Sequence, residues 1–389
     1  MAETSGSSGA ELRLARQARG LSQQQLASMT GVTRQAVSAI ESGYSDPSLR
    51  VAFALARALG LSVQKLFGPG EPAEAVTAVS VASLADQGGR VSLVPVGERL
   101  IALPLRGDTG ASLGFVPAGG LAVAPGPPSR SIGRPVPATV SGASGYAEQT
   151  AGPSLVSVRP VAPLRPTLVV AGCDPALPLL AAPLALLDPP IAFAWWPCGS
   201  GAALRLAEQG LVHAAGVHSK NGSGQGGTPD QEGTGVIGFA AWREGIALRP
   251  GLESTVTGLG AIAQQGLRIV NRESGSEARN LLDTECRRLA IAPGDLPGYD
   301  TRAAGHLQVA SAISAGLAAA GITTEPAARV YGLAFVPLAE ERFSLVIPAM
   351  HAASREVQAL LKVLSSPWLL AQLAAIPGYD AASCGDRVA

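Results

Sequence analysis

Over residues 11–67, apolar residues recur at helical spacing, and short turns that contain glycine interrupt the pattern. Apolar residues three and four positions apart share one face of a helix, so the pattern predicts a bundle of short amphipathic helices. Ser22 and Thr33 stand where helix N-caps are expected. The pattern stops at a Pro/Gly cluster, which places a helical domain at residues 11–68. The preceding residues 1–10, rich in Ser and Gly, are expected to be a disordered arm.

Residues 73–165 show a different pattern, in which short apolar runs alternate with Gly, Pro, Ser and Asp. Runs of this length separated by turn-forming residues predict a small β-rich connector, either an all-β subdomain or an extension of a neighbouring sheet. The predicted strands are Arg90–Val96, Arg99–Pro104, Leu113–Val116, Leu121–Val123 and Leu155–Val161. Residues 125–152, mostly Pro, Gly, Ser and Ala, predict a long loop.

From residue 166 to residue 380, buried-strand patterns alternate with helical ones, which predicts an α/β sheet flanked by helices. The alternation divides near residues 245–255 and returns near 335–347, as in a domain of two lobes with a cleft between them. The predicted fold is therefore multidomain: an all-α helix-turn-helix head, a β-rich connector and a two-lobed α/β domain. Residues 381–389 are expected to form a tail.

Charge and cysteine usage narrow the class of protein. Formal net charge is zero over 389 residues, but residues 11–67 hold seven Arg and Lys against three acids, a local charge of +4. Such asymmetry is typical of a small nucleic-acid-binding head. The four cysteines lie far apart without a C-x-x-C pair, so we expect buried thiols in a reducing cytoplasm rather than a zinc site or disulfides. No signal peptide or membrane span is expected, because the N-terminus lacks an apolar core and prolines interrupt the most apolar stretch.

A helix, a tight turn and a second helix that begins with short polar residues can present that second helix to the major groove of double-stranded DNA. The segments Gly20-Leu21-Ser22-Gln23, Leu26-Ala27, Gly31-Val32-Thr33 and Val37-Ser38-Ala39-Ile40-Glu41 resemble the lambda-repressor/Cro-like (Xre) helix-turn-helix family. The resemblance implies a recognition helix capped by Thr33, and an Arg16–Glu41 ion pair that serves stability. The implied DNA-binding residues are Gln23, Thr33, Arg34, Gln35 and Ser38.

Arg can pair with guanine and Gln with adenine, while Gln23 stands where a helix N-terminus meets a phosphate. The alternative is a helical bundle that contacts another protein. Thr33, Arg34 and Gln35 at an exposed helix start, together with the local positive charge, favour DNA.

In the C-terminal half, small and hydroxyl residues follow a predicted strand and begin a helix at three places, residues 172–174, 199–201 and 274–276. Helix N-termini carry free N–H groups and the positive end of the helix dipole, so they bind anions. Each motif alone is commonly a mere cap, but strand ends that share one edge of a sheet favour a ligand site in a cleft.

The C-terminal half also resembles the periplasmic-binding-protein-like domain found in some bacterial regulators and fused to molybdopterin-biosynthesis proteins. The segments that carry the resemblance are Ala171-Gly172-Cys173-Asp174-Pro175-Ala176-Leu177, Gly199-Ser200-Gly201, Ala215-Gly216-Val217-His218, Asn271-Arg272-Glu273-Ser274-Gly275-Ser276, Pro297-Gly298-Tyr299, His306, and Phe335-Val336-Pro337-Leu338 with Glu341-Arg342. The resemblance implies a ligand-sensing fold and, as its ligand, molybdate or a related oxyanion. The chain departs from the pattern at Ser276-Glu277-Ala278-Arg279 and at Ala319, where similar domains have Thr-Arg and an acid.

Ten residues are candidates for ligand contact in this cleft. They are Cys173, Asp174, Ser200, Gly201, His218, Ser274, Gly275, Ser276, Arg279 and His306. Asp174 conflicts with an oxyanion because a carboxylate repels an anion, so it is either a helix cap or, with Arg279, part of a site for a zwitterion. His218 and His306 either line the cleft or occupy satisfied positions in the core.

The sequence contains no P-loop, no G-x-S-x-G elbow and no H-E-x-x-H motif, so we expect neither an enzyme nor a cofactor or metal site. The combined patterns predict a cytoplasmic one-component transcriptional regulator, a homodimer that binds double-stranded DNA and a small-molecule or oxyanion effector. Two alternatives remain open at this point. One is an effector-free DNA-binding protein with a C-terminal dimerisation or protein-interaction scaffold, and the other is a binding module for molybdenum-cofactor intermediates.

Overall fold

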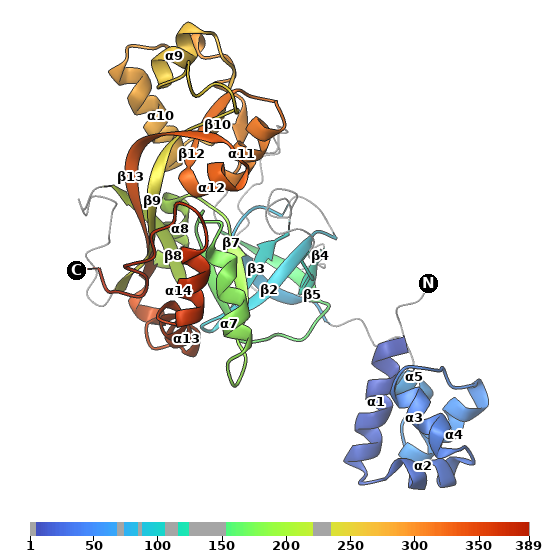
Figure 1. The fold of residues 1–389 in the computed structure, drawn as a ribbon. Helices are drawn as coiled ribbons and strands as arrows, with labels where there is room; N and C mark the ends of the chain where they lie inside the picture. The colour runs from blue at the N-terminus through green and yellow to red at the C-terminus, as the bar shows by residue number, and fades with distance from the viewer. Residues whose placement is uncertain are drawn as a thin grey trace, which may run out of the picture. The chain divides into compact units, whose positions relative to one another are not determined.

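The computed structural model describes residues 5–67, 74–84, 88–105, 116–123, 153–220 and 235–388. It forms two compact units, Met1–Ala75 and Val76–Ala389 (Figure 1). The loop predicted at residues 125–152 lies outside the described part of the chain.

The first unit is a bundle of helices, as its apolar periodicity predicts. They are α1 (Ser5–Ala18), α2 (Gln23–Thr30), α3 (Arg34–Glu41), α4 (Leu49–Leu59) and α5 (Val63–Phe67). The expected N-caps are present, since Ser22 Oγ accepts a hydrogen bond from Gln25 N and Thr33 Oγ1 accepts one from Ala36 N, both at 3.1 Å. Leu12, Leu26 and Leu55 lie among the fully buried residues of the shared core.

The expectation of a disordered arm is corrected for residues 5–10, because α1 begins at Ser5. Gly9 lies in the part of α1 that packs on α3. It lies so close to the end of α3 that a Cβ atom at this position would overlap the carbonyl oxygen of Ile40. The absence of a side chain therefore allows α1 to pack closely on α3.

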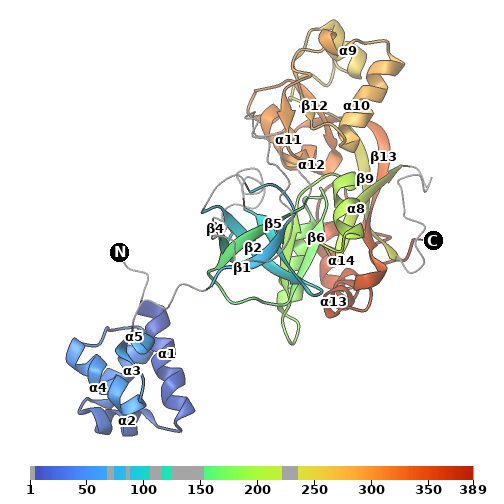
Figure 2. The same ribbon diagram turned by 180° about the vertical axis from the view of Figure 1, so that it is seen from behind.

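The second unit begins with a closed β-barrel, a more definite structure than the subdomain or sheet extension predicted. Its strands are β1 (Val76–Ser80), β2 (Arg90–Val96), β3 (Arg99–Pro104), β4 (Gly120–Val123) and β5 (Ser154–Pro160), in the order β1-β3-β2-β4-β5. Figure 2 shows the barrel beside β6, and barrel residues such as Val94 and Ile101 share one buried cluster with Val169. The barrel is thus part of the packed core.

The rest of the second unit is built on an eight-stranded sheet with the order β11-β10-β12-β9-β13-β8-β6-β7. These strands are β6 (Thr167–Ala171), β7 (Ala192–Trp196), β8 (Ala214–Lys220), β9 (Gly235–Leu248), β10 (Ile269–Arg272), β11 (Arg302–Ala303), β12 (Ala320–Thr324) and β13 (Ala334–Ile347). We call the part with β6, β7 and β8 the first lobe and the part with β10, β11 and β12 the second lobe.

Helices cover both lobes. The first lobe carries the 3-10 helix η2 (Leu177–Leu180), α7 (Ala181–Ala185), α8 (Ser200–Glu208), the 3-10 helix η4 (Ala349–His351), α13 (Arg355–Leu364) and α14 (Pro367–Ala374). The second lobe carries α9 (Leu259–Gln264), α10 (Glu277–Arg288), the 3-10 helix η3 (Pro293–Asp295), α11 (His306–Ser314) and α12 (Glu325–Val330). No single helix in the described ranges is long and apolar enough to cross a membrane; only α13 and α14 taken together, bent by 59°, meet the length and composition.

The long strands β9 and β13 connect the two lobes. For each of them the sequence pattern predicts two short strands, because charged residues such as Glu244 and Glu341 interrupt the apolar runs. The predicted strands are Val236–Trp242, Gly245–Leu248, Leu333–Pro337 and Phe343–Ile347. That prediction is wrong: each is a single strand of 14 residues. β9 pairs with β12 through residues 244–248, whereas β13 pairs with β8 through residues 341–346, so the pair passes from one lobe to the other.

A second correction concerns β12. The sequence pattern over His306–Ala319 predicts one helix, but α11 ends at Ser314, and the strand β12, which the pattern does not predict, follows at Ala320. The segment Ala320–Thr324 is short, consists of small residues and is buried throughout, so it carries neither a helical nor an alternating pattern. Only its pairing with β9 and β10 makes it a strand.

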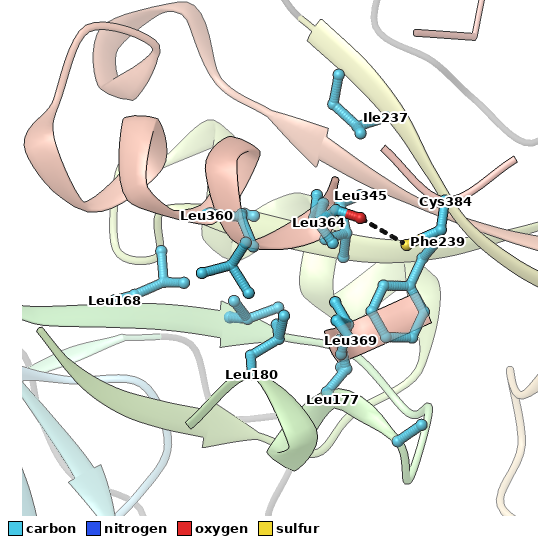
Figure 3. Packing of buried hydrophobic residues seen from close by; sticks show 14 of the residues in the cluster. Leu168, Leu177, Leu180, Ile237, Phe239, Leu345, Leu360, Leu364, Leu369 and Cys384 are labelled. Atoms are coloured by element: carbon cyan, nitrogen blue, oxygen red, sulfur yellow. Dashed lines mark hydrogen bonds between the residues drawn. The ribbon is translucent and has the colours of Figure 1, made fainter. Parts of the chain in front are cut away.

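The apolar core of the first lobe also holds the end of the chain. Figure 3 shows Leu360, Leu364 and Leu369 of α13 and α14 packed against Leu168, Leu177, Leu180 and Phe239. Cys384 lies in the same cluster, and its Sγ donates a 3.4 Å hydrogen bond to Leu364 O. The segment predicted as a tail therefore packs on this lobe.

His213 offers a test of this core. Its ring is buried, its Nδ1 accepts a 3.0 Å hydrogen bond from Val169 N, and its centroid lies 5.1 Å from that of His351. Burial, helped by repulsion from His351, lowers the pKa of His213 to about 4. In the unfolded chain the pKa of His213 is about 6.5, so the unfolded state takes up a proton first as the pH falls. The free energy of unfolding is therefore highest above pH 6.5 and decreases as the pH falls towards 4.

We predict that His213→Asn, which keeps an acceptor near the position of Nδ1, reduces the loss of stability in acid. Between pH 7 and pH 5 the free energy of unfolding of the wild type should fall by about 2 kcal/mol more than that of the variant. Urea unfolding followed by tryptophan fluorescence reports on the second unit, which contains all four tryptophans. Equal pH dependence of the two proteins would contradict the prediction.

Candidate functional site

The candidate DNA-binding residues lie on α2 and α3 of the first unit. Arg34, Gln35 and Ser38 are exposed along one side of α3, and Thr33 caps this helix while remaining exposed itself. The opposite side of α3 is buried through Val37 and Ile40. The helix therefore presents a short polar face with a cation at its N-terminal end.

Gln23, at the start of α2, contacts the C-terminal end of α3. Its Nε2 donates a 2.9 Å hydrogen bond to Glu41 Oε2, so the side chain is held against the end of α3. Glu41 also accepts two hydrogen bonds from Arg16, Nε to Oε1 at 2.6 Å and Nη2 to Oε2 at 3.0 Å. The predicted Arg16–Glu41 pair is thus present, and it ties α1 and α2 to α3.

The pKa of Glu41 fits this structural role. Burial would raise the pKa, but the hydrogen bonds from Arg16 and Gln23 lower it below its ordinary value. Glu41 therefore stays ionised and paired.

In the second unit, a pocket lies where strand ends of the first lobe meet the second lobe. It offers about 50 Å³ of space, enough for an ion or a very small molecule. From the first lobe its lining includes Cys173, Trp195 and Cys198, and from the second Arg272 and His306. The ends of the parallel strands β6, β7 and β10 contribute residues, which is the position where α/β sheets bind ligands.

A chain of polar contacts runs from this pocket to the strands that connect the lobes. His218 Nε2 lies 2.7 Å from Cys173 Sγ, and His218 Nδ1 lies 2.9 Å from Glu341 Oε2 on β13. Burial alone would lower the pKa of His218, but Cys173 and Glu341 raise it well above its ordinary value. The imidazole of His218 therefore favours the charged form beside these two groups.

His306, from the second lobe, lies close to the ring of His218. It is the first residue of α11, is buried, and has its ring centroid 6.2 Å from that of His218. Thr323 Oγ1 lies 3.4 Å from its Nδ1. Burial, and then the positive charges of Arg272 and His218, hold the pKa of His306 well below its ordinary value, so this ring is neutral. Three of the predicted residues, Cys173, His218 and His306, thus meet from two lobes.

Asp174 points elsewhere. Its Oδ1 accepts hydrogen bonds from Tyr379 Oη and, at 2.9 Å, from Ala176 N. Burial raises the pKa of the carboxyl to about 6, although these two hydrogen bonds act in the opposite direction. The side chain holds the turn after β6 and reaches the C-terminal segment, but it is not the N-cap of a helix, because η2 begins at Leu177 with Ala176 as its N-cap.

Of the small-residue motifs, those at residues 199–201 and 274–276 lie near each other but outside the pocket. Ser200 Oγ accepts a 3.2 Å hydrogen bond from His218 N, and a Cβ atom on Gly199 would lie 3.8 Å from Gly275 O, so the start of α8 faces the turn before α10. Gly201, Ser274 and Gly275 are exposed. None of these is among the residues that line the pocket.

Ser276 and Arg279 serve α10 itself. Ser276 Oγ caps the helix by accepting a 3.3 Å hydrogen bond from Arg279 N. The Arg279 guanidinium lies 4.0 Å from the centroid of the Tyr299 ring, and its Nε donates to Asp283 at 3.1 Å. The structure therefore places Arg279 with Asp283 and Tyr299 rather than with Asp174.

The sequence analysis did not select two charged residues that belong to the site, Arg272 and Glu341. Arg272 is almost fully buried, lines the pocket, and donates to Glu273 through Nε and Nη2, both at 2.8 Å. Its Nη1 is buried without a hydrogen-bond partner in the described structure. Glu341 lies far along the chain but reaches His218. Charged residues at the end or in the middle of an apolar strand are the signal that points to both.

A larger hollow of about 890 Å³ lies along β9 and β13, between Trp242, Arg243, Glu325 and Tyr379. It is open and its charges are largely paired, as in the contact of Arg243 Nε with Glu325 Oε2 at 2.7 Å. Its size does not make it the better candidate, because the smaller pocket gathers the titratable groups.

Comparison with known proteins agrees with this division of the chain. Residues 12–66 match a family model described as helix-turn-helix, and residues 181–365 match one described as a PBP superfamily domain. The chain is 40% identical over 57 residues to the uncharacterized HTH-type transcriptional regulator MJ0272 of Methanocaldococcus jannaschii, which is 15% of this chain and 86% of that protein.

Two further proteins are similar. The uncharacterized protein YvgK of Bacillus subtilis is 30% identical over 145 residues, 37% of this chain and 46% of YvgK, so the chain spans less than half of that relative. The crystal structure of the restriction-modification controller protein C.AhdI from Aeromonas hydrophila is 39% identical, with 16% of this chain and 94% of that chain covered and a TM-score of 0.16.

Proposed function

Since the chain belongs to the helix-turn-helix family of DNA-binding transcriptional regulators and carries a PBP-superfamily domain, we propose that it is a one-component regulator without catalytic activity. In this proposal a small effector binds between the two lobes and changes the affinity of the head for DNA. The observation that carries this proposal is the pocket whose lining comes from both lobes. A ligand that touches both lobes binds one arrangement of the lobes better than another, and such a preference is what shifts a population.

The DNA-binding half of the proposal rests on α3. Its exposed Arg34, Gln35 and Ser38 have the side-chain types that pair with base edges, and the opposite face anchors the helix in the core. We propose that the regulator acts as a homodimer, because two such heads about one helical turn apart read a palindromic site.

We propose an anionic effector, with molybdate or a related oxyanion as the first compounds to test. Arg272 supports this, because a buried guanidinium nitrogen without a partner favours an anion. The objection raised by Asp174 is weakened, because this carboxyl is hydrogen-bonded to Tyr379 and Ala176 and does not line the pocket.

We predict that Arg34→Ala weakens binding to the native operator by roughly 1–3 kcal/mol, or about 5- to 150-fold, because it removes a side chain able to bond a guanine at two points. Fluorescence anisotropy with operator and scrambled DNA measures the effect. Arg57→Ala removes the same charge from an exposed position on α4 and should leave the ratio of specific to nonspecific affinity unchanged. Unchanged operator affinity in Arg34→Ala would refute the assignment.

We predict that an oxyanion effector raises the thermal stability of the second unit, by about 2.7 kcal/mol at a concentration 100 times its dissociation constant. A thermal-shift panel with molybdate, tungstate, sulfate and phosphate identifies the effector. Arg272→Lys should reduce the shift, whereas Asp174→Asn should retain it, because Asp174 lies outside the pocket. No shift with any anion would refute the oxyanion assignment, and operator affinity unaffected by any effector would refute the coupling.

A further inference from the structure

We propose that Cys173, His218 and His306 form a binding site for one thiophilic transition-metal ion of the Zn²⁺ class. This inference names a second ligand class for the pocket of the proposed function, and it rests on that function only for its regulatory consequence.

The three ligand atoms, one sulfur and one ring nitrogen from each histidine, all lie within 4.8 Å of one another. Tetrahedral Zn²⁺ with ordinary bond lengths needs about 3.6 Å between a sulfur and a nitrogen ligand. The present distance from Cys173 Sγ to His218 Nε2 is 2.7 Å, so these two atoms must separate by about 0.9 Å to admit the ion. Rotation of the half-exposed Cys173 side chain suffices for a change of this size.

Both histidines are oriented as metal ligands are. A ligating histidine commonly binds the metal with one ring nitrogen and hydrogen-bonds a carboxylate or another acceptor with the other. His218 Nδ1 contacts Glu341 Oε2 at 2.9 Å, which directs Nε2 toward Cys173, and the proton that the charged ring carries on Nε2 is released to solvent when the ion binds. His306 Nδ1 lies 3.4 Å from Thr323 Oγ1, which leaves Nε2 as the ligand atom. Trp242 and Phe343 pack edge-on against His218, with ring centroids at 5.7 and 5.2 Å, and fix its plane.

The donor set selects the metal. One thiolate and two imidazoles suit Zn²⁺, Co²⁺ or Cu²⁺, whereas Mg²⁺ and Ca²⁺ prefer oxygen ligands. Three protein ligands leave a fourth position open, as in zinc sites that accept an exchangeable ligand. Cys173 and His306 line the pocket beside Arg272, so an anion in the fourth position would meet both the metal and the guanidinium.

Because the ligands come from both lobes, binding of the ion favours one arrangement of the lobes. Cys173 follows β6 and His218 lies on β8, both in the first lobe, while His306 begins α11 in the second. The ion binds with all three ligands only when the lobes are together. Its binding free energy therefore favours the closed arrangement, the preference that an effector requires.

The test uses reduced, metal-free full-length protein titrated with Co²⁺ and then with Zn²⁺. We expect one Co²⁺ per chain, with the near-ultraviolet thiolate-to-cobalt charge-transfer band and the visible bands of a four-coordinate ion, all of which Zn²⁺ abolishes. Cys173→Ser and His306→Gln should weaken binding by at least about 100-fold, and Glu341→Gln, which loosens the orientation of His218, by roughly 10- to 100-fold. Cys286→Ser is the matched control, because this buried thiol on α10 lies outside both the pocket and the ligand set, and it should bind Co²⁺ normally.

A second measurement needs no variant. Cys173 is the one half-exposed cysteine of the four, so iodoacetamide should modify it first, and one equivalent of Zn²⁺ should protect it. No stoichiometric Co²⁺ binding, a cobalt spectrum without the thiolate band, or alkylation of Cys173 that Zn²⁺ leaves unchanged would overturn the site. Operator affinity measured with and without Zn²⁺ separates the two proposals: metal binding without a change in DNA affinity refutes the coupling and leaves the metal site standing.

Discussion

Two buried carboxylates at the crossing between the lobes constrain the rest of the second unit. Glu244 on β9 and Glu341 on β13 are both almost fully buried, where an isolated charge is costly. Burial and the neighbouring Glu341 raise the pKa of Glu244 well above its ordinary value, which favours its neutral form. Glu341 contacts His218, so the residues that connect the lobes also orient the candidate site.

This arrangement links the position of the lobes to the chemistry of the pocket. A relative movement of the lobes changes the distance from His306 to Cys173 and His218, while the contact between His218 and Glu341 stays within the first lobe and the crossing strand. The pocket is therefore lined by two groups of residues, one from each lobe. A ligand held by both lobes would favour the arrangement in which they are together, and this preference is the physical basis of the coupling to DNA affinity that we propose.

The helix-turn-helix head is organised by local interactions. Ser22 and Thr33 cap their helices within the same turn. The Arg16–Glu41 ion pair joins α1 to α3, and the hydrogen bond from Gln23 to Glu41 adds α2. The recognition surface follows from this frame, because burying Val37 and Ile40 turns Arg34, Gln35 and Ser38 outward. Gln23 of α2 is joined to the end of α3, because its amide donates a hydrogen bond to Glu41.

The sequence alone determined the head, because helix periodicity, caps and turn glycines act over a few residues, and it determined the two-lobed α/β class through alternation of elements. It failed where pairing partners decide the structure, as for Ala320–Thr324, which is a strand only through β9 and β10. The directions of Asp174 and Arg279 were likewise open in the sequence, and only Tyr379, Asp283 and Tyr299 settled them. The meeting of Cys173, His218 and His306 depended on the tertiary structure altogether, because residues so far apart in the chain become neighbours only when two lobes close on each other.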